Sequence, residues 1–245
     1  MTPYYSDDAA GIVVYLGDSR AMLPTFATRA DVCLTDPPYD IGTHQGARAL
    51  HGGSVEIVGI DFAPVDPAWV APLLLSVTRR WVVAFCALEQ LGAYQSAAGD
   101  AWVRSGTWHK INGPPQYTGD RPAQGCEGIT LLHQTDRRME WNGGGSQAHW
   151  SYAIASGVRI HPTQKPEPLM TRLVELFSRR GETVLDPFLG GGTTGVVAKR
   201  LGRKFIGVEL KEAYCEAACK RIEATQVQVA FAFDAQDDAG QGSLL

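Results

Sequence analysis

The 245-residue sequence has few cysteines, no long apolar run and no strong excess of one charge. Its five cysteines form no CxxC pair, which argues against a zinc site and a disulfide framework. No apolar run approaches the ~18 residues of a membrane span, and the start MTPYYSDDAAG lacks the basic and apolar pattern of a secretory signal. We therefore expect a cytoplasmic protein with no metal site and no membrane span.

The net charge of −4 is unevenly distributed along the chain. Five aspartates lie in the two tails, at positions 7, 8, 234, 237 and 238. Without them, 21 of the 26 acidic residues remain against 22 Lys and Arg residues, so the body of the chain is nearly neutral. The net charge therefore does not exclude a nucleic-acid partner. We expect residues 234–245 to form a disordered acidic tail.

Short apolar runs alternate with helical stretches along most of the chain. Several runs are rich in Val and Ile, as in strands that are covered on both faces. The expected strands are 12–16, 32–34, 81–85, 129–132, 183–185 and 205–208. Four helices are expected: one from Asp66-Pro67, which Pro72 should break or kink, one over 167–180, one from about Thr193, and one over 212–225. This alternation predicts one doubly wound α/β domain over residues 1–230.

The stretch TDPPYD, residues 35 to 40, follows one of these strands directly. Prolines end strands and stiffen turns. The stretch should therefore form a rigid corner that presents Asp36 and Tyr39.

A second informative stretch is TVLDPFLGGGTTGVVAKRLGRKFIGVEL, residues 183 to 210. A strand ends at Asp186, a glycine-rich turn containing Gly190 and Gly192 follows, and the next strand ends at Glu209. This arrangement predicts a nucleoside site, with the acid on ribose hydroxyls. A nicotinamide-dependent oxidoreductase is one alternative. Against it, Asp186 stands where a pyrophosphate would need a bare turn, and the DPPY corner has no role in hydride transfer.

TDPPYD and LDPFLGGGTT, together with HPTQKP at 161–166, resemble the S-adenosylmethionine (SAM)-dependent DNA amino-methyltransferases that act on adenine N6 or cytosine N4. The order of the motifs is similar to the beta type, in which DPPY precedes FxGxG. The resemblance covers roughly residues 12 to 224. It implies SAM as cofactor, double-stranded DNA as partner, and a mostly parallel, seven-stranded Rossmann-like sheet. The implied strand order is 3-2-1-4-5-7-6, in a circularly permuted chain.

The resemblance also assigns roles to individual residues. The catalytic motif would be Asp36, Pro37, Pro38 and Tyr39. Residues expected at the cofactor are Asp18, Asp36, Thr163, Gln164, Lys165, Asp186, Pro187, Phe188, Gly190, Gly192, Thr193, Thr194, Glu209 and Leu210. In this set the glycine turn cradles the methionine part, Thr163 to Lys165 border its carboxylate, Glu209 holds the ribose, and Asp18 contacts the adenine.

Two irregular segments, 40–65 and 112–160, are the expected DNA-facing regions. Tyr39, Arg137 and Arg138 are the expected DNA contacts. Trp141, Trp150 and the run Asn142 to Gly145 are interpreted as local core and a loop. Because little chain is available for recognition, we expect a short recognition site or a homodimer. A bacterium, phage or prophage is the expected source, with or without a paired nuclease.

The DPPY corner suits transfer to an aryl amine, whose lone pair is conjugated into the ring. Asp36 and the Pro37 carbonyl would accept its two N–H bonds, and Tyr39 would stack on a flipped-out base. In the family, Asp at the first position is typical of adenine enzymes and Ser of most cytosine enzymes, so N6-adenine is the prediction. N4-cytosine remains an alternative, and a non-catalytic DNA-binding subunit is an alternative of another class.

Overall fold

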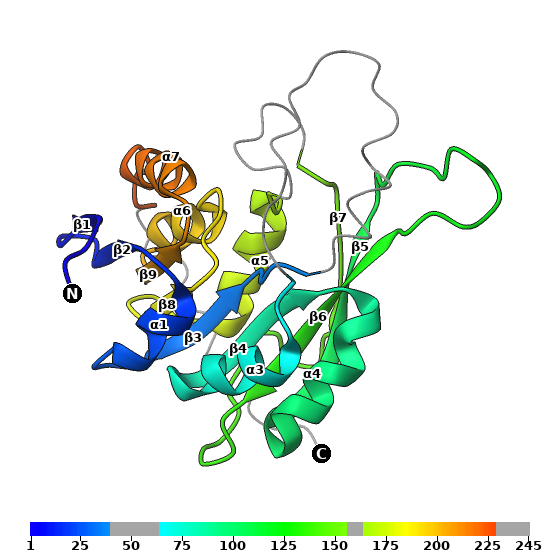
Figure 1. The fold of residues 1–245 in the computed structure, drawn as a ribbon, viewed down its shortest axis with the longest axis horizontal. Helices are drawn as coiled ribbons and strands as arrows, with labels where there is room; N and C mark the ends of the chain where they lie inside the picture. The colour runs from blue at the N-terminus through cyan, green and yellow to red at the C-terminus, as the bar shows by residue number, and fades with distance from the viewer. Residues whose placement is uncertain (40–63, 156–163, 229–245) are drawn as a thin grey trace, which may run out of the picture.

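The computed structural model describes residues 1–39, 64–155 and 164–228, and a nine-stranded sheet runs through it with helices on both faces (Figure 1). The strands are β1 (Tyr5–Asp7), β2 (Ile12–Leu16), β3 (Ala30–Thr35), β4 (Thr78–Cys86), β5 (Trp102–Lys110), β6 (Cys126–His133), β7 (His149–Tyr152), β8 (Thr183–Asp186) and β9 (Lys204–Glu209). The helices are α1 (Ser19–Met22), α3 (Pro67–Ser76), α4 (Leu91–Ala98), α5 (Glu167–Phe177), α6 (Thr193–Arg200) and α7 (Glu212–Glu223), with short 3-10 helices η1 (Leu23–Thr25), η3 (Leu88–Gln90) and η4 (Gly99–Ala101).

The strand order is β1-β2-β9-β8-β3-β4-β6-β5-β7. The sheet is mixed and mostly parallel, with antiparallel pairs only at β1–β2, β4–β6 and β5–β6. The expected number of seven strands was too low, because β1 and β7 add one short strand at each edge. The seven inner strands lie in the order β2-β9-β8-β3-β4-β6-β5. This is the implied order 3-2-1-4-5-7-6 when β8, the strand before the glycine turn, is numbered 1, β9 and β2 are numbered 2 and 3, and β3, β4, β5 and β6 are numbered 4 to 7. The parallel pairing of β2 with β9 is the one that the expected permutation requires.

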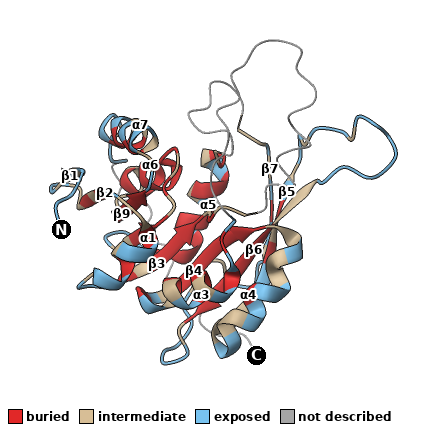
Figure 2. Cartoon of the chain, in the orientation of Figure 1, coloured by how far each residue is buried: buried red, intermediate tan, exposed pale blue. Residues whose placement is uncertain are grey.

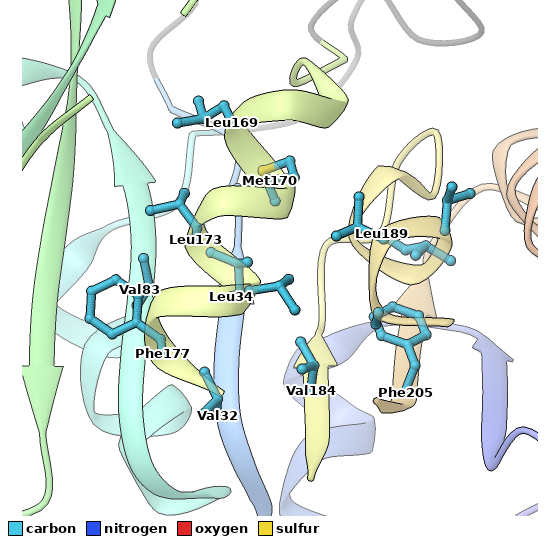
Figure 3. Packing of buried hydrophobic residues seen from close by; sticks show 14 of the residues in the cluster. Val32, Leu34, Val83, Leu169, Met170, Leu173, Phe177, Val184, Leu189 and Phe205 are labelled. Atoms are coloured by element: carbon cyan, nitrogen blue, oxygen red, sulfur yellow. The ribbon is translucent and has the colours of Figure 1, made fainter. Parts of the chain in front are cut away.

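Central strands are buried on both faces, as their Val- and Ile-rich sequences predict (Figure 2). In β3, Val32 and Leu34 pack with α5, α6 and α7, whereas Cys33 points to the opposite core with α3 and α4. The apolar face of α5 carries Leu169, Met170, Leu173 and Phe177 against the sheet (Figure 3). Helices cover both faces of the sheet, so a ligand can reach it at the carboxyl ends of the parallel strands.

Two local expectations need correction. Pro72 does not break α3, which continues to Ser76. The proline and Ala68, whose carbonyl loses its partner, are both exposed, so this carbonyl is open to solvent. In addition, the 112–160 segment is less irregular than expected, because it contains β7 as well as β6, the strand that was expected at 129–132.

All five cysteines are free thiols, as predicted. Within the described residues, no helix has both the length and the apolar character needed to cross a bilayer.

Candidate active site

Four acidic residues lie at or just beyond the carboxyl ends of adjacent parallel strands. The register aligns the end of β2 with the end of β9 (Leu16 with Glu209) and Asp186 at the end of β8 with Gly207. Asp36 directly follows the end of β3, and Asp18 lies two residues after the end of β2. The acidic corner and the glycine turn, which are about 150 residues apart in the sequence, therefore meet at one edge of the sheet, the usual ligand site of such folds.

The corner is fixed on both sides. Thr35, the last residue of β3, is fully buried and donates a 2.7 Å hydrogen bond to Asp186 Oδ1. The Pro38 carbonyl accepts a 2.8 Å hydrogen bond from the Val65 amide, just before α3. Pro37 is buried between them. Hydrogen bonds at Thr35 and Pro38 thus hold the corner that carries Asp36 and Tyr39, as expected of a rigid corner.

Asp36 belongs to a buried group of charged side chains. Lys165 Nζ lies 2.6 Å from Asp36 Oδ2 and 3.1 Å from Glu127 Oε2. Lys110 Nζ lies 2.7 Å from the other oxygen of Glu127, and the Tyr39 hydroxyl donates a 2.7 Å hydrogen bond to Glu127 Oε2. Two carboxylates and two ammonium groups therefore balance, as buried charges must.

Sequence reasoning missed Glu127 and Lys110 as site residues. Glu127 is a charged residue near the start of the buried strand CEGITLLH, and this was the only available signal. Lys165 was expected beside the carboxylate of the cofactor; the structure places its ammonium group 2.6 Å from Asp36 Oδ2, and its contact with a cofactor stays a prediction.

The surroundings of Asp36 and Glu127 shift the pKa values of the two carboxylates in opposite directions. Burial raises the pKa of Asp36 above its ordinary value, and Lys165 partly offsets this rise. Burial also opposes ionisation of Glu127, but Lys165 and Lys110 outweigh it and lower the pKa of Glu127 to about 2. Burial opposes the charge of Lys165 as well, yet the two carboxylates raise its pKa overall. The pKa of Glu127 therefore lies below its ordinary value and that of Asp36 lies above its ordinary value.

The glycine turn between β8 and α6 needs its glycines for two reasons. Gly190 and Gly192 have positive φ angles of 51° and 78°, which favour glycine. A Cβ atom on Gly192 would lie 2.7 Å from the Cβ of Ala218 in α7. The turn therefore stays close to α7 and directs the first amides of α6 toward the edge of the sheet, as a site for a polar ligand requires.

Asp186 holds this turn from inside. Its carboxylate accepts hydrogen bonds from Thr35 and Thr194 (2.7 and 2.6 Å) and from the Phe188 amide (3.2 Å). Burial nevertheless raises the pKa of Asp186 to about 6. Three internal donors give this side chain a structural role, and its direct contact with a cofactor stays a prediction.

Glu209 is buried and accepts hydrogen bonds from the amides of Gly190 (2.8 Å) and Lys211 (2.9 Å). Leu210 beside it is exposed. Asp18 caps α1 by accepting a 2.9 Å hydrogen bond from the Arg20 amide and also pairs with the Arg20 guanidinium. Ser19 donates to the Pro187 carbonyl, so the end of β2 is tied to the glycine turn. The structure thus gathers the predicted nucleoside residues around one turn.

The remaining predicted cofactor residues divide into two groups. Phe188 is half-buried, and Thr193 and Thr194 are buried in the first turn of α6. Gln164 directly precedes Lys165, while Thr163 and the segment 40–63 lie outside the described residues. Among described residues, no cluster of three His, Cys, Asp or Glu side chains could hold a metal ion.

Arg137 and Arg138 are not brought to this site. They follow β6, which runs antiparallel to β4. The end of β6 therefore lies beside the start of β4, at the opposite ends of the strands from Asp36. Arg137 lies 3.0 Å from Asp136. Asn142 also lies away from the site, where it donates to the carbonyls of Glu175 and Ser178 at the end of α5. Trp150 is core, as interpreted from the sequence.

Comparisons with known proteins agree on a class of enzyme. Residues 97–220 match the N6/N4 family described as DNA methylase. The chain is 27% identical to the type II methyltransferase M2.DpnII of Streptococcus pneumoniae, over 91% of this chain and 92% of that protein. It is 29% identical to the type II methyltransferase M2.LlaDCHI of Lactococcus lactis subsp. cremoris, over 90% and 91% of the two chains.

Two solved structures share the fold. The M1.HpyAVI–SAM complex has a TM-score of 0.66 and 24% identity, over 86% of this chain and 99% of that one. The cytosine-N4-specific PvuII DNA methyltransferase has a TM-score of 0.63 and 16% identity, over 86% of both chains.

Proposed function

Because this chain belongs to the N6/N4 family of DNA methylases, we propose that it transfers a methyl group from SAM to the N6 amino group of adenine in double-stranded DNA. The observation that carries the proposal is the position of Asp36. This half-buried acid lies on a rigid corner, at the same ends of the parallel strands as the glycine turn and Glu209.

The residues of the glycine turn fit the cofactor. Gly190 and Gly192 let the backbone approach a ligand closely, and Glu209 presents a carboxylate beside them. Glu209 would hold the ribose hydroxyls, the turn would hold the methionine part, and exposed Leu210 would border the adenine. When bound, SAM supplies a methyl group on a sulfonium, which needs no strong base for transfer.

Asp36 would accept one N–H of the target amine, and the Pro37 carbonyl would accept the other. Both acceptors favour a pyramidal nitrogen whose lone pair points away from the ring, so catalysis is mainly positioning and electrostatics. Tyr39 would stack on the extruded base, worth about 1–3 kcal/mol. The base must leave the duplex because its amino group is otherwise inaccessible.

Asp rather than Ser at position 36 supports adenine as the target. The test is to incubate the protein with methyl-labelled SAM and unmethylated genomic DNA, digest the DNA to nucleosides, and identify the labelled one by mass. Label in N6-methyladenine is expected. Label in N4-methylcytosine would reverse the choice of base, and no labelled nucleoside on diverse DNA would favour a non-catalytic DNA-binding subunit.

A further inference from the structure

The two oxygens of the Asp36 carboxylate have different surroundings. Oδ2 accepts a 2.6 Å hydrogen bond from Lys165. Oδ1 is buried and has no hydrogen-bond partner within the described part of the chain. Buried carboxylate oxygens nearly always have a donor, so an unpartnered one in a candidate site needs an explanation.

The ammonium group on Oδ2 is itself held in place. Lys165 is 94% buried, with a side-chain exposure of 6%, and lies over the Phe85 ring at 4.8 Å from its centroid. Its second charged partner is Glu127 Oε2 at 3.1 Å. Lys165 enters from the segment before α5 and Glu127 from β6, so the pair connects two separate parts of the fold.

Glu127 also controls the ring of the corner. The same Oε2 atom accepts the Tyr39 hydroxyl at 2.7 Å. Its other oxygen is held by Lys110 of the neighbouring strand β5, at 2.7 Å. One carboxylate on a central strand thus fixes both the cation on Asp36 and the hydroxyl of Tyr39.

Resting on the proposed function, we propose that Glu127 is a positioning residue for methyl transfer: it holds Lys165 on Asp36 Oδ2 and orients Tyr39, so that Oδ1 accepts the amino group of the target base. Lys165 then fixes the rotation of the Asp36 carboxylate, and the incoming amine finds a desolvated acceptor that no protein donor occupies. Glu127 does not contact the base in this arrangement and acts only through its two neighbours.

The main test variant is Glu127→Gln, which keeps the size of the side chain and an acceptor for Tyr39 but removes the charge that holds Lys165. We expect kcat to fall by about 10- to 100-fold, as for a misplaced reacting group, while KM for DNA changes much less. Glu182→Gln is the matched control, because Glu182 forms a comparable 2.8 Å ion pair with Arg80 away from the site. The control should retain wild-type kcat.

A second readout needs no catalysis. The pKa of Asp36 can be followed in the free protein by 13C-carboxyl NMR, with the signal identified by its absence in Asp36→Asn. Glu127 raises this pKa and Lys165 lowers it. If Glu127 holds Lys165 in place, Glu127→Gln releases Lys165 from Oδ2 and should raise the Asp36 pKa, as Lys165→Met should. Loss of the Glu127 charge with Lys165 still in place would instead lower it and would contradict the positioning role. The other titratable groups that face Asp36 from surrounding elements are Tyr39, Cys86, Tyr94, Lys110 and Asp186, and they are unchanged in both variants.

The outcomes separate this inference from the proposed function. If the wild type methylates DNA but Glu127→Gln retains kcat within twofold of Glu182→Gln, the positioning role is wrong and the proposed function stands. If no variant moves the Asp36 pKa, the coupling is also absent. If the wild type labels no nucleoside, the proposed function fails, whereas the NMR titration still measures the coupling. Should Glu127→Gln not fold, Glu127→Gln with Lys110→Met restores the charge balance and carries the same test.

Discussion

The hydroxyl of Thr35 donates a 2.7 Å hydrogen bond to Asp186 Oδ1. Thr35 immediately precedes the DPPY corner, and Asp186 immediately precedes the glycine turn. Their strands, β3 and β8, are parallel neighbours. This bond therefore connects the residues proposed to bind the base with those proposed to bind the cofactor.

Replacing Thr35 with Val should loosen this connection. Asp186 Oδ1 would retain only the longer bond from Phe188, and the loss of a buried donor should cost about 1–2 kcal/mol of unfolding free energy. Thr130→Val is the matched control. Thr130 is equally buried in a strand, but its hydroxyl has no partner within the described residues. Urea unfolding should show Thr130→Val as neutral or stabilising. Equal losses in the two variants would contradict the role assigned to Thr35.

Asp186 should give stability a distinctive pH dependence. Its pKa in the folded protein is raised to about 6 from an ordinary value of 3.8. Between about pH 4 and 6 the folded protein therefore binds a proton that the unfolded chain has released, and this carboxyl makes stability fall as pH rises. Two pKa units correspond to about 3 kcal/mol. This contribution should vanish in Asp186→Asn. The unfolding free energy of the variant minus that of the wild type, measured by urea unfolding, should therefore rise with pH over this range. A constant difference would show that the pKa of Asp186 is not raised.

The central fold could be predicted because its strands are short apolar runs. All six predicted strands are present, within a few residues of their expected ends. Two of the other strands, β1 and β7, have three and four residues at the sheet edges. The third, β5, carries Trp108 and Gly106 on its buried side and polar residues on the other, so it has no apolar run.

The site could be predicted only where a motif was local in the sequence. The corner and the glycine turn each occupy a few consecutive residues, and parallel strands bring them together. Glu127 and Lys110 depend instead on the register between β5 and β6, which places Trp108 opposite Glu127. Nothing in the two separate sequences fixes this register, so the charge network could not be derived from the sequence.

Asp36 and Tyr39 should act in transfer more than in folding. Asp36→Ala should abolish methyl transfer but keep a folded protein, because Lys165 retains Glu127 as a partner. Tyr39→Phe keeps the ring face but loses the hydroxyl on Glu127, so we expect a moderate loss of rate, whereas Tyr39→Ala should lose more. Rates under single turnover and thermal melts would measure both effects. An Asp36→Ala protein that unfolds would indicate a structural role, and a fully active one would remove Asp36 from catalysis.

Gly195 should be intolerant of even a small side chain. Its added Cβ atom would lie 2.6 Å from Ile222 Cδ1 and 2.8 Å from Phe205 Cε1, so α6 would be pushed away from α7 and β9. Overpacking of this kind costs about 1–3 kcal/mol. Gly92 in α4 has no atom within 4 Å of the corresponding position, so Gly92→Ala should stabilise by about 0.5–1 kcal/mol. Thermal melts of both variants test this, and a neutral Gly195→Ala would mean that α6 and α7 can separate at little cost.

The surface that meets DNA can be found with two matched arginines. Arg121 and Arg137 are both exposed, and each pairs with the preceding aspartate, at 2.9 and 3.0 Å. Arg121 lies on the loop between β5 and β6, which projects from the sheet edge that carries Lys110 and Glu127 (Figure 1). Arg137 follows the end of β6 and lies at the opposite ends of the strands from Lys110 and Glu127.

If the candidate site is where DNA binds, only Arg121→Gln should weaken binding. Loss of one phosphate contact reduces the slope of log affinity against log salt by about 1. Arg137→Gln should leave that slope unchanged, because its edge of the sheet is remote from Asp36. Affinities for one duplex, measured by fluorescence anisotropy over a series of salt concentrations, give both slopes. A reduced slope in Arg137→Gln with none in Arg121→Gln would place the DNA on the opposite edge, and a base bound there could not reach Asp36.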